Sequence, residues 1–112
     1  MTVARTRDYA DTHPVEMFPG VIRRTLVSGD HVTLVQITLS SGAEVPEHSH
    51  PHEQAGTVAG GRIHLQIRDE SWELGPGASY LIPGDVPHTV SAIDAATLVE
   101  VFSPVREEFA ND

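Results

Sequence analysis

The stretch Gly42-Ala43-Glu44-Val45-Pro46-Glu47-His48-Ser49-His50-Pro51-His52-Glu53-Gln54 gathers three of the seven histidines of this 112-residue chain into five positions. Neutral imidazole is the commonest protein ligand of divalent transition metals. Side chains alternate faces along an extended chain, so His48 and His50 point the same way and their nitrogens can close on one ion. Two imidazoles alone make a weak site, and the pattern therefore predicts further ligands elsewhere in the chain.

The best distant candidate ligand is His88, which ends the segment Ile82-Pro83-Gly84-Asp85-Val86-Pro87-His88. Gln54 is a second candidate, because an amide oxygen can coordinate a metal and leaves the ion its full positive charge. His52 follows Pro51, which interrupts the extended geometry, so its face is not fixed. His52 could therefore be a metal ligand, could lie behind the ligands and contact them, or could lie at the surface.

These two segments resemble the paired motifs of the cupin superfamily. The first motif is matched by Gly42, His48, His50 and Gly60, with Gln54 at its glutamate position. The second is matched by Gly77, Pro83 and His88, with Asp85 in place of a glycine and Ala92 in place of an asparagine. The resemblance implies a single-domain, all-β double-stranded β-helix, which is the cupin jelly-roll barrel. It also implies one divalent transition metal per chain: zinc, nickel, manganese, iron, cobalt or copper.

A second cluster of chemically active side chains lies near the C-terminus. Glu100 falls on the same face as Leu98 and Phe102 in an apolar run. An unpaired carboxylate buried there would cost several kcal/mol or have a raised pKa, so Glu100 is paired, functional, or in water at an edge or a dimer interface. Arg106 follows shortly, and its guanidinium is suited to holding a substrate carboxylate bidentately.

Together, the string His-x-His-Pro-His-Glu-Gln and this C-terminal cluster are similar to the small single-domain cupins of the KdgF group. That group linearises 4,5-unsaturated uronates released from pectin or alginate. The resemblance implies metal ligation by His48, His50, Gln54 and His88. It implies catalytic roles for Glu100, Phe102 and Arg106. Glu100 stands where that group commonly has Asp and reaches one methylene further. A metal-dependent dioxygenase and a non-catalytic ligand-binding or sensor module remain open as alternatives.

Composition excludes several other chemistries. The chain contains no cysteine, which excludes disulfides, thiolate nucleophiles and cysteine-ligated metal clusters. It contains no lysine, which excludes Schiff-base catalysis. A formal net charge of -9 disfavours nucleic acid as a partner. No apolar stretch approaches the ~20 residues of a membrane span, and the N-terminus lacks the apolar region of a signal peptide. We expect a cytoplasmic protein that binds a small-molecule substrate.

The chain shows no internal repeat or linker, which favours one domain. We expect an N-terminal arm at residues 1–20 that packs on the barrel or on a dimer partner, a cupin barrel at 21–104 and a tail at 105–112 that forms at most one helical turn. A homodimer is predicted from the apolar side chains that one sandwich leaves uncovered. Alternation and turn residues predict strands at Val21–Val27, Val32–Leu39, Gln54–Ala59, Arg62–Arg68, Ser79–Ile82, His88–Ile93 and Thr97–Phe102.

Overall fold

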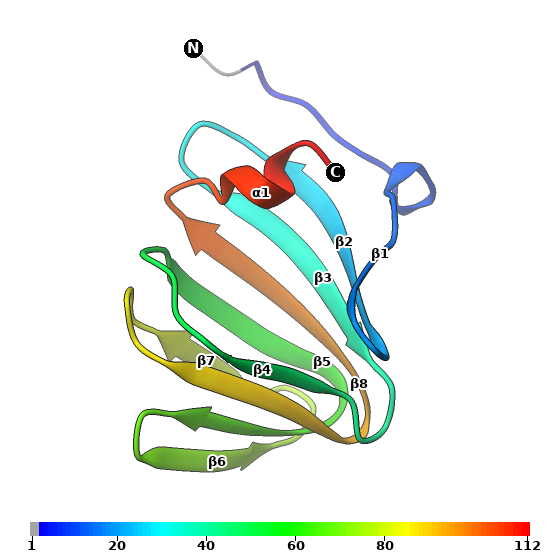
Figure 1. The fold of residues 1–112 in the computed structure, drawn as a ribbon. Coiled ribbons are helices and arrows are strands. Elements are labelled where there is room, and N and C mark those ends of the chain that lie inside the picture. Colours follow the sequence, from blue (N-terminus) through cyan, green and yellow to red (C-terminus); the bar gives the residue numbers. More distant parts are fainter. Residues whose placement is uncertain (1–2) are drawn as a thin grey trace.

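Antiparallel strands make up most of the computed structural model, which describes residues 3–112 (Figure 1). A short 3₁₀ turn at Tyr9–Asp11 precedes them, and the single-turn helix α1 at Glu107–Ala110 follows them. The strands are β1 (Val15–Phe18), β2 (Val21–Ser28), β3 (Thr33–Leu39), β4 (Glu44–His48), β5 (Glu53–Ile67), β6 (Glu70–Leu74), β7 (Ser79–Ile82) and β8 (His88–Ser103).

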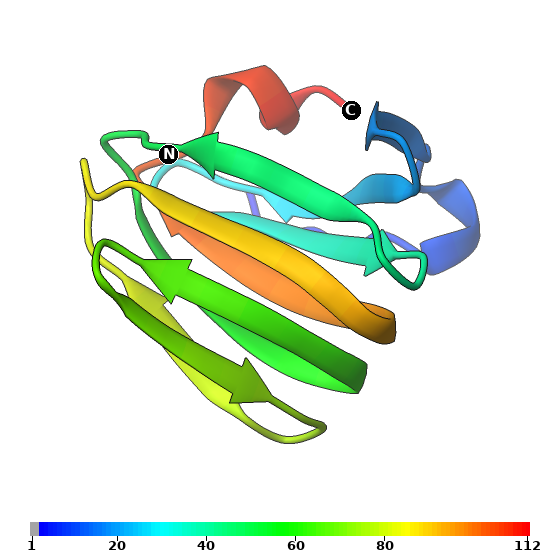
Figure 2. The ribbon, with the colours of Figure 1, turned by 60° about the horizontal axis from the view of Figure 1, so that its bottom comes forward.

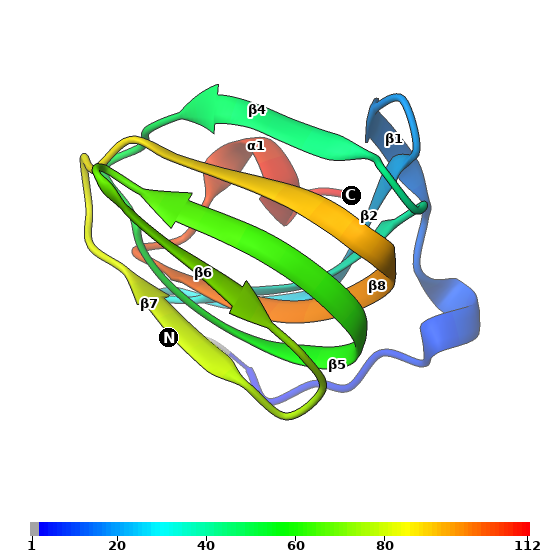
Figure 3. The same cartoon turned by 90° about the horizontal axis from the view of Figure 1, so that it is seen from below.

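The two longest strands, β5 and β8, pair with each other along both of their halves. Residues 53–58 of β5 lie between β7 and the second half of β8, whereas residues 62–67 lie between β6 and the first half of β8. The paired strands therefore run through both faces of the barrel, which Figures 2 and 3 show from two further directions. Strands β1, β2 and β3 extend one face, and β4 extends the other.

The bend in β5 depends on Gly61. Its φ is +78°, a left-handed conformation that glycine adopts without steric penalty. A Cβ at this position would lie 2.0 Å from the backbone oxygen of Ala95 on β8. Glycine therefore allows the two long strands to stay in contact while they turn from one sheet to the other.

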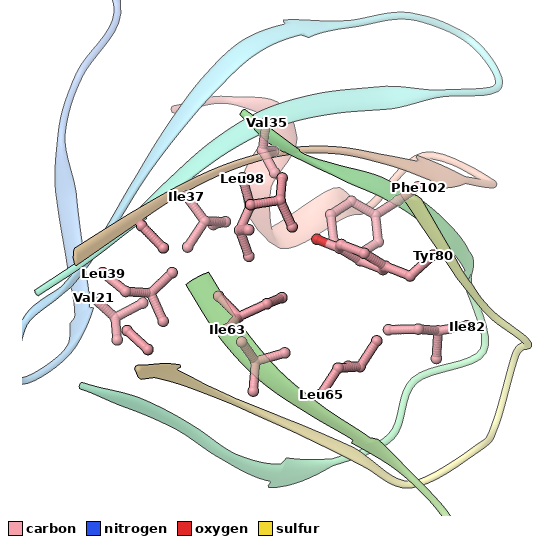
Figure 4. Close-up of a cluster of buried hydrophobic side chains, with 14 of the residues drawn as sticks. Val21, Val35, Ile37, Leu39, Ile63, Leu65, Tyr80, Ile82, Leu98 and Phe102 are labelled. Atoms are coloured by element: carbon pink, nitrogen blue, oxygen red, sulfur yellow. The ribbon is translucent and has the colours of Figure 1, made fainter. Parts of the chain in front are cut away.

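Side chains alternate along each long strand between the barrel interior and its outer surface, and the inward-facing ones fill the barrel. On β8 the even-numbered residues are buried from His88 to Ala92 and again from Ala96 to Phe102, while residues 93–95 at the bend are exposed. Figure 4 shows the resulting core, to which each face contributes. Its largest fully buried side chains include Phe102, Ile63, Leu65, Ile82 and Leu98.

The predicted all-β jelly roll is confirmed. The predicted strands Val21–Val27 and Val32–Leu39 correspond to β2 and β3, and Ser79–Ile82 is β7. Two predicted boundaries were wrong, because β5 and β8 bend without losing their pairing and each is one strand rather than two. Strands β1, β4 and β6 were not predicted. β1 has only four residues, and β4 and β6 have mostly exposed side chains and no buried face to reveal them. Among residues 3–112, no helix has the length and apolar character needed to cross a membrane.

Candidate metal centre

Three histidines from different parts of the chain meet at one end of the barrel. His48 ends β4, His88 begins β8, and the two residues are cross-strand partners. His50 lies in the loop between β4 and β5. One ring nitrogen from each of the three lies within 4.8 Å of the others, which is close enough for a single ion to be shared.

The second ring nitrogen of each histidine faces a backbone carbonyl. Nδ1 lies 2.9 Å from the oxygen of Pro46 for His48, 3.1 Å from that of His52 for His50, and 2.8 Å from that of Val86 for His88. A carbonyl can only accept, so Nδ1 of each ring carries the proton and donates it. The neutral tautomer is thereby fixed with the Nε2 lone pair free, as in metal sites that hold histidine through its other nitrogen.

The environment of these Nε2 atoms fits a bound cation. His88 Nε2 is buried and has no hydrogen-bond partner in residues 3–112, although buried polar atoms are normally paired. His50 Nε2 faces Gln54 Oε1 at 3.1 Å, and a neutral His50 that donates from Nδ1 cannot also donate here. Burial, together with the charges of Arg106, His88 and His48, lowers the pKa of His50 to about 4. Burial also lowers the pKa of His88. Two acceptors that face each other in this way suit a metal between them.

A backbone hydrogen bond joins the two loops that carry the ligands. The N–H of Asp85, two residues after Pro83, donates to the backbone oxygen of His50 at 2.7 Å. Asp85 has a φ of +62°, the conformation that the cupin motif usually assigns to glycine, and Asp tolerates it. The substitution at this motif position therefore leaves the geometry of the loop intact.

Gln54 and Glu100 lie directly behind the histidines. Gln54 Nε2 donates to Glu100 Oε2 at 2.7 Å, and the hydroxyl of Tyr80 donates to the same oxygen at 2.6 Å. Glu100 is 6% exposed, and burial raises the pKa of its carboxyl group despite these two donors and the nearby Arg106. Of the alternatives that the sequence left open for Glu100, the structure shows a buried carboxylate that is paired by hydrogen bonds.

A pocket that opens to solvent lies beside the histidines. Apolar side chains line most of it, and its polar lining consists of His48, Gln54, His88, Glu100 and Arg106. The α1 helix lies on the side of the barrel where β4 and β2 are not paired with each other (Figure 3), and its Phe109 also lines the pocket.

Two aromatic rings that contact each other also contact the guanidinium of Arg106. The carbon of its guanidinium lies 4.8 Å from the ring centre of Phe102 and 4.2 Å from that of Phe109. Nε donates to Glu108 at 2.6 Å, while neither terminal nitrogen makes a hydrogen bond within the described chain. Phe102 itself is 2% exposed and packs edge-on against His50. It therefore supports the histidine and the arginine as well as walling the pocket.

The other four histidines do not belong to this three-histidine group. His52 is buried, and its ring lies 5.5 Å from that of His50 and 6.3 Å from that of Phe102, outside the three-histidine group. Its Nδ1 also lacks a partner in residues 3–112. His13 and His31 are exposed, and His64 is half-buried on the outer side of β5.

Three residues of the site were not found from the sequence. They are Tyr80, which contacts Glu100, Phe109, which lines the pocket, and Arg23, which packs on Phe109. Only the folded structure brings them to these positions. Tyr80 alternates with exposed neighbours on β7, which marks it as inward-facing, but its contact with Glu100 depends on the strand order. Arg23 stacks on Phe109 at 3.9 Å and pairs with Asp112, so it holds the C-terminal segment in place.

The barrel and its inward-facing histidines define a β-barrel protein with a candidate metal site at one end. The cupin domain model matches residues 35–102, and the chain belongs to the cupin family. No curated protein matches the chain.

Solved structures agree with this assignment over nearly the whole chain. A RmlC-like cupin from Shewanella frigidimarina is 27% identical, with a TM-score of 0.89 over 96% of this chain and 97% of that one. KdgF from Halomonas sp. is 23% identical, with a TM-score of 0.87 over 93% and 98% of the two chains. The polyketide cyclase RemF from Streptomyces resistomycificus is 24% identical, with a TM-score of 0.75 over 91% and 80%. The last two likenesses show the fold alone.

Proposed function

We propose that each chain binds one divalent transition metal through Nε2 of His48, His50 and His88 and through Oε1 of Gln54. The observation that carries this proposal is the fixed tautomer: each histidine donates its Nδ1 proton to a backbone carbonyl and turns Nε2 inward. Three imidazoles and an amide oxygen suit zinc, nickel, manganese, iron, cobalt or copper. When bound, such an ion supplies Lewis acidity toward substrate oxygens.

The substrate is a small oxygenated molecule with a carboxylate. Arg106 supports this choice, because its flat guanidinium packs against two aromatic rings and both of its terminal nitrogens are unpaired in the described chain. Two parallel N–H groups match the geometry of a carboxylate. The stem and ring contacts orient the fork, so the charge is presented in a fixed direction.

The reaction is the ring opening and tautomerisation of 4,5-unsaturated uronates, by analogy with the KdgF group. Both hydrogen bonds to Glu100 end on Oε2, so Oε1 is the atom available to a substrate in the pocket. It accepts the proton of the anomeric hydroxyl as the bond between carbon 1 and the ring oxygen breaks. The released enolate then takes up one proton at carbon 4, which replaces the proton lost to Glu100, and becomes a ketone. This isomerisation balances without a co-reactant.

The environment of Glu100 favours such proton transfer. Burial raises the pKa of Glu100, so its carboxylate is a stronger base than an exposed one. Phe102 and Phe109 give the pocket an apolar wall beside the guanidinium. The carboxyl group and the arginine are therefore the two groups of the chain that act on the substrate.

The experiment compares the parent protein with Glu100→Gln on a 4,5-unsaturated uronate, following the ultraviolet absorbance of its conjugated double bond. Glu100→Gln keeps the shape but cannot act as a base, so turnover is expected to fall by ~10²–10⁴ with metal content unchanged. His64→Ala, outside the site, is the matched control. Equal activity in Glu100→Gln would contradict the proton-transfer role. No activity in a metal-loaded parent would contradict the uronate substrate.

A further inference from the structure

Tyr80, Gly56 and Glu100 form one row across three strands. Gly56 of β5 is the cross-strand partner of Tyr80 on β7 and of Glu100 on β8. The Tyr80 side chain, 8% exposed, crosses over Gly56 to reach the carboxylate. A Cβ at Gly56 would lie 2.4 Å from the Tyr80 ring, so this crossing requires glycine. In Figure 4 the Tyr80 ring points into the barrel, with its hydroxyl among the core side chains.

This row determines which end of the Gln54 amide faces the histidines. Glu100 Oε2 accepts one hydrogen bond from Tyr80 and one from the amide nitrogen of Gln54. The amide oxygen is then left toward His50 Nε2, at 3.1 Å. A reversed amide would direct two N–H donors at a bound cation and would place its oxygen against the carboxylate. One oxygen of Glu100 remains an acceptor in either protonation state, so the orientation does not depend on its charge.

We propose that Tyr80 and Glu100 act as a clamp that positions Gln54 as a metal ligand, in addition to any role of Glu100 toward substrate. Tyr80 is a positioning residue, because it acts on the metal through Glu100 and Gln54. The clamp rests on the proposed metal site. It assigns Glu100 two separable functions: Oε2 orients the ligand, and Oε1 faces the pocket.

Because the two functions of Glu100 are separable, two substitutions at this position should affect metal affinity differently. Glu100→Gln retains an oxygen that can accept from both Gln54 and Tyr80. Glu100→Leu has a similar size and fits the apolar face shared with Leu98 and Phe102, but it has no acceptor. Loss of a residue that orients a metal ligand typically lowers metal affinity by 10–100-fold. Tyr80→Phe removes one donor and leaves the carboxylate, so its effect is smaller.

The test adds Co²⁺ to metal-free protein and records the visible spectrum and the dissociation constant against a competing chelator. Glu100→Gln is expected to match the parent in both. Glu100→Leu is expected to bind Co²⁺ about 10–100-fold more weakly, with the spectrum of Gln54→Leu, since both variants lose the same ligand. The Co²⁺ affinity of Tyr80→Phe is expected to lie between those of Glu100→Gln and Glu100→Leu. Circular dichroism verifies that each variant is folded.

The outcomes separate the clamp from the metal site itself. If Glu100→Leu keeps the parent's spectrum and affinity while His88→Ala loses binding, the clamp is wrong and the metal site stands. If Glu100→Gln changes the spectrum as Glu100→Leu does, the charge rather than the acceptor holds Gln54, and the clamp as stated is also wrong. A parent protein that binds no Co²⁺ would overturn the metal site and the clamp together.

Discussion

Gly56→Ala introduces one methyl group at the point where Tyr80 crosses β5. The new Cβ would lie 2.4, 2.5 and 2.6 Å from three atoms of the Tyr80 ring and hydroxyl, distances at which some atom must move. Tyr80 is 8% exposed, so its ring has little room to shift. Overpacking of this kind costs ~1–3 kcal/mol, and the weakened hydrogen bond to Glu100 adds ~1 kcal/mol. We expect a loss of ~2–4 kcal/mol in the free energy of unfolding, or roughly 10 °C in Tm.

Urea unfolding of the metal-free protein, followed by circular dichroism, measures this loss. Gly60→Ala is the matched control, because Gly60 lies in the same strand, has no positive φ, and a Cβ there meets nothing within 4 Å. Its free energy of unfolding is expected to be unchanged, or raised by ~0.4–1 kcal/mol through the lower entropy of the unfolded chain. A Gly56→Ala protein within ~0.5 kcal/mol of the parent would refute the tight crossing on which the clamp depends.

Three further predictions concern pH, substrate and assembly. The folded pKa of His50, about 4, lies below that of free imidazole, so its neutral form persists on acidification; NMR titration of the metal-free protein should find the His50 ring still neutral at about pH 5, and a midpoint near ~6.5 would contradict this. Arg106→Lys keeps the charge but loses the planar fork, so KM for a carboxylated substrate should rise about tenfold or more, and an unchanged KM would count against Arg106 as the carboxylate site. We also propose a two-fold dimer in which residues 1–20 contribute to the interface; a monomeric mass by light scattering at micromolar concentration would rule it out.

The histidine cluster could be predicted because its information is local. His48 and His50 lie two positions apart in an extended segment, and His88 follows a turn that a short motif describes. The sequence also indicated that Glu100 shares a strand face with Leu98 and Phe102, but it left burial and exposure at an edge open. Periodicity within one strand carries this signal and that of His48 and His50, whereas the spacing of the motif carries that of His88.

The support behind the ligands could not be predicted in the same way. Tyr80 meets Glu100 only because β5 lies between β7 and β8 in a register that pairs Gly56 with both. Strand order and register are properties of the whole sheet, and a single strand does not encode them. The pairing of Arg106 with Glu108 and the stacking on Phe109 likewise depend on where the last turn docks. His52 stayed open because Pro51 interrupts the alternation that placed its neighbours.

Metal content is the most direct test of the account, because the histidine site is its central claim. Elemental analysis of protein purified without added metal, and again after reconstitution and desalting, should find one divalent transition metal per chain in the parent and in His64→Ala. His48→Ala, His50→Ala and His88→Ala each remove one inward Nε2 and should lose most of that metal. Equal metal content in all five proteins would contradict the claim that these three histidines form the site.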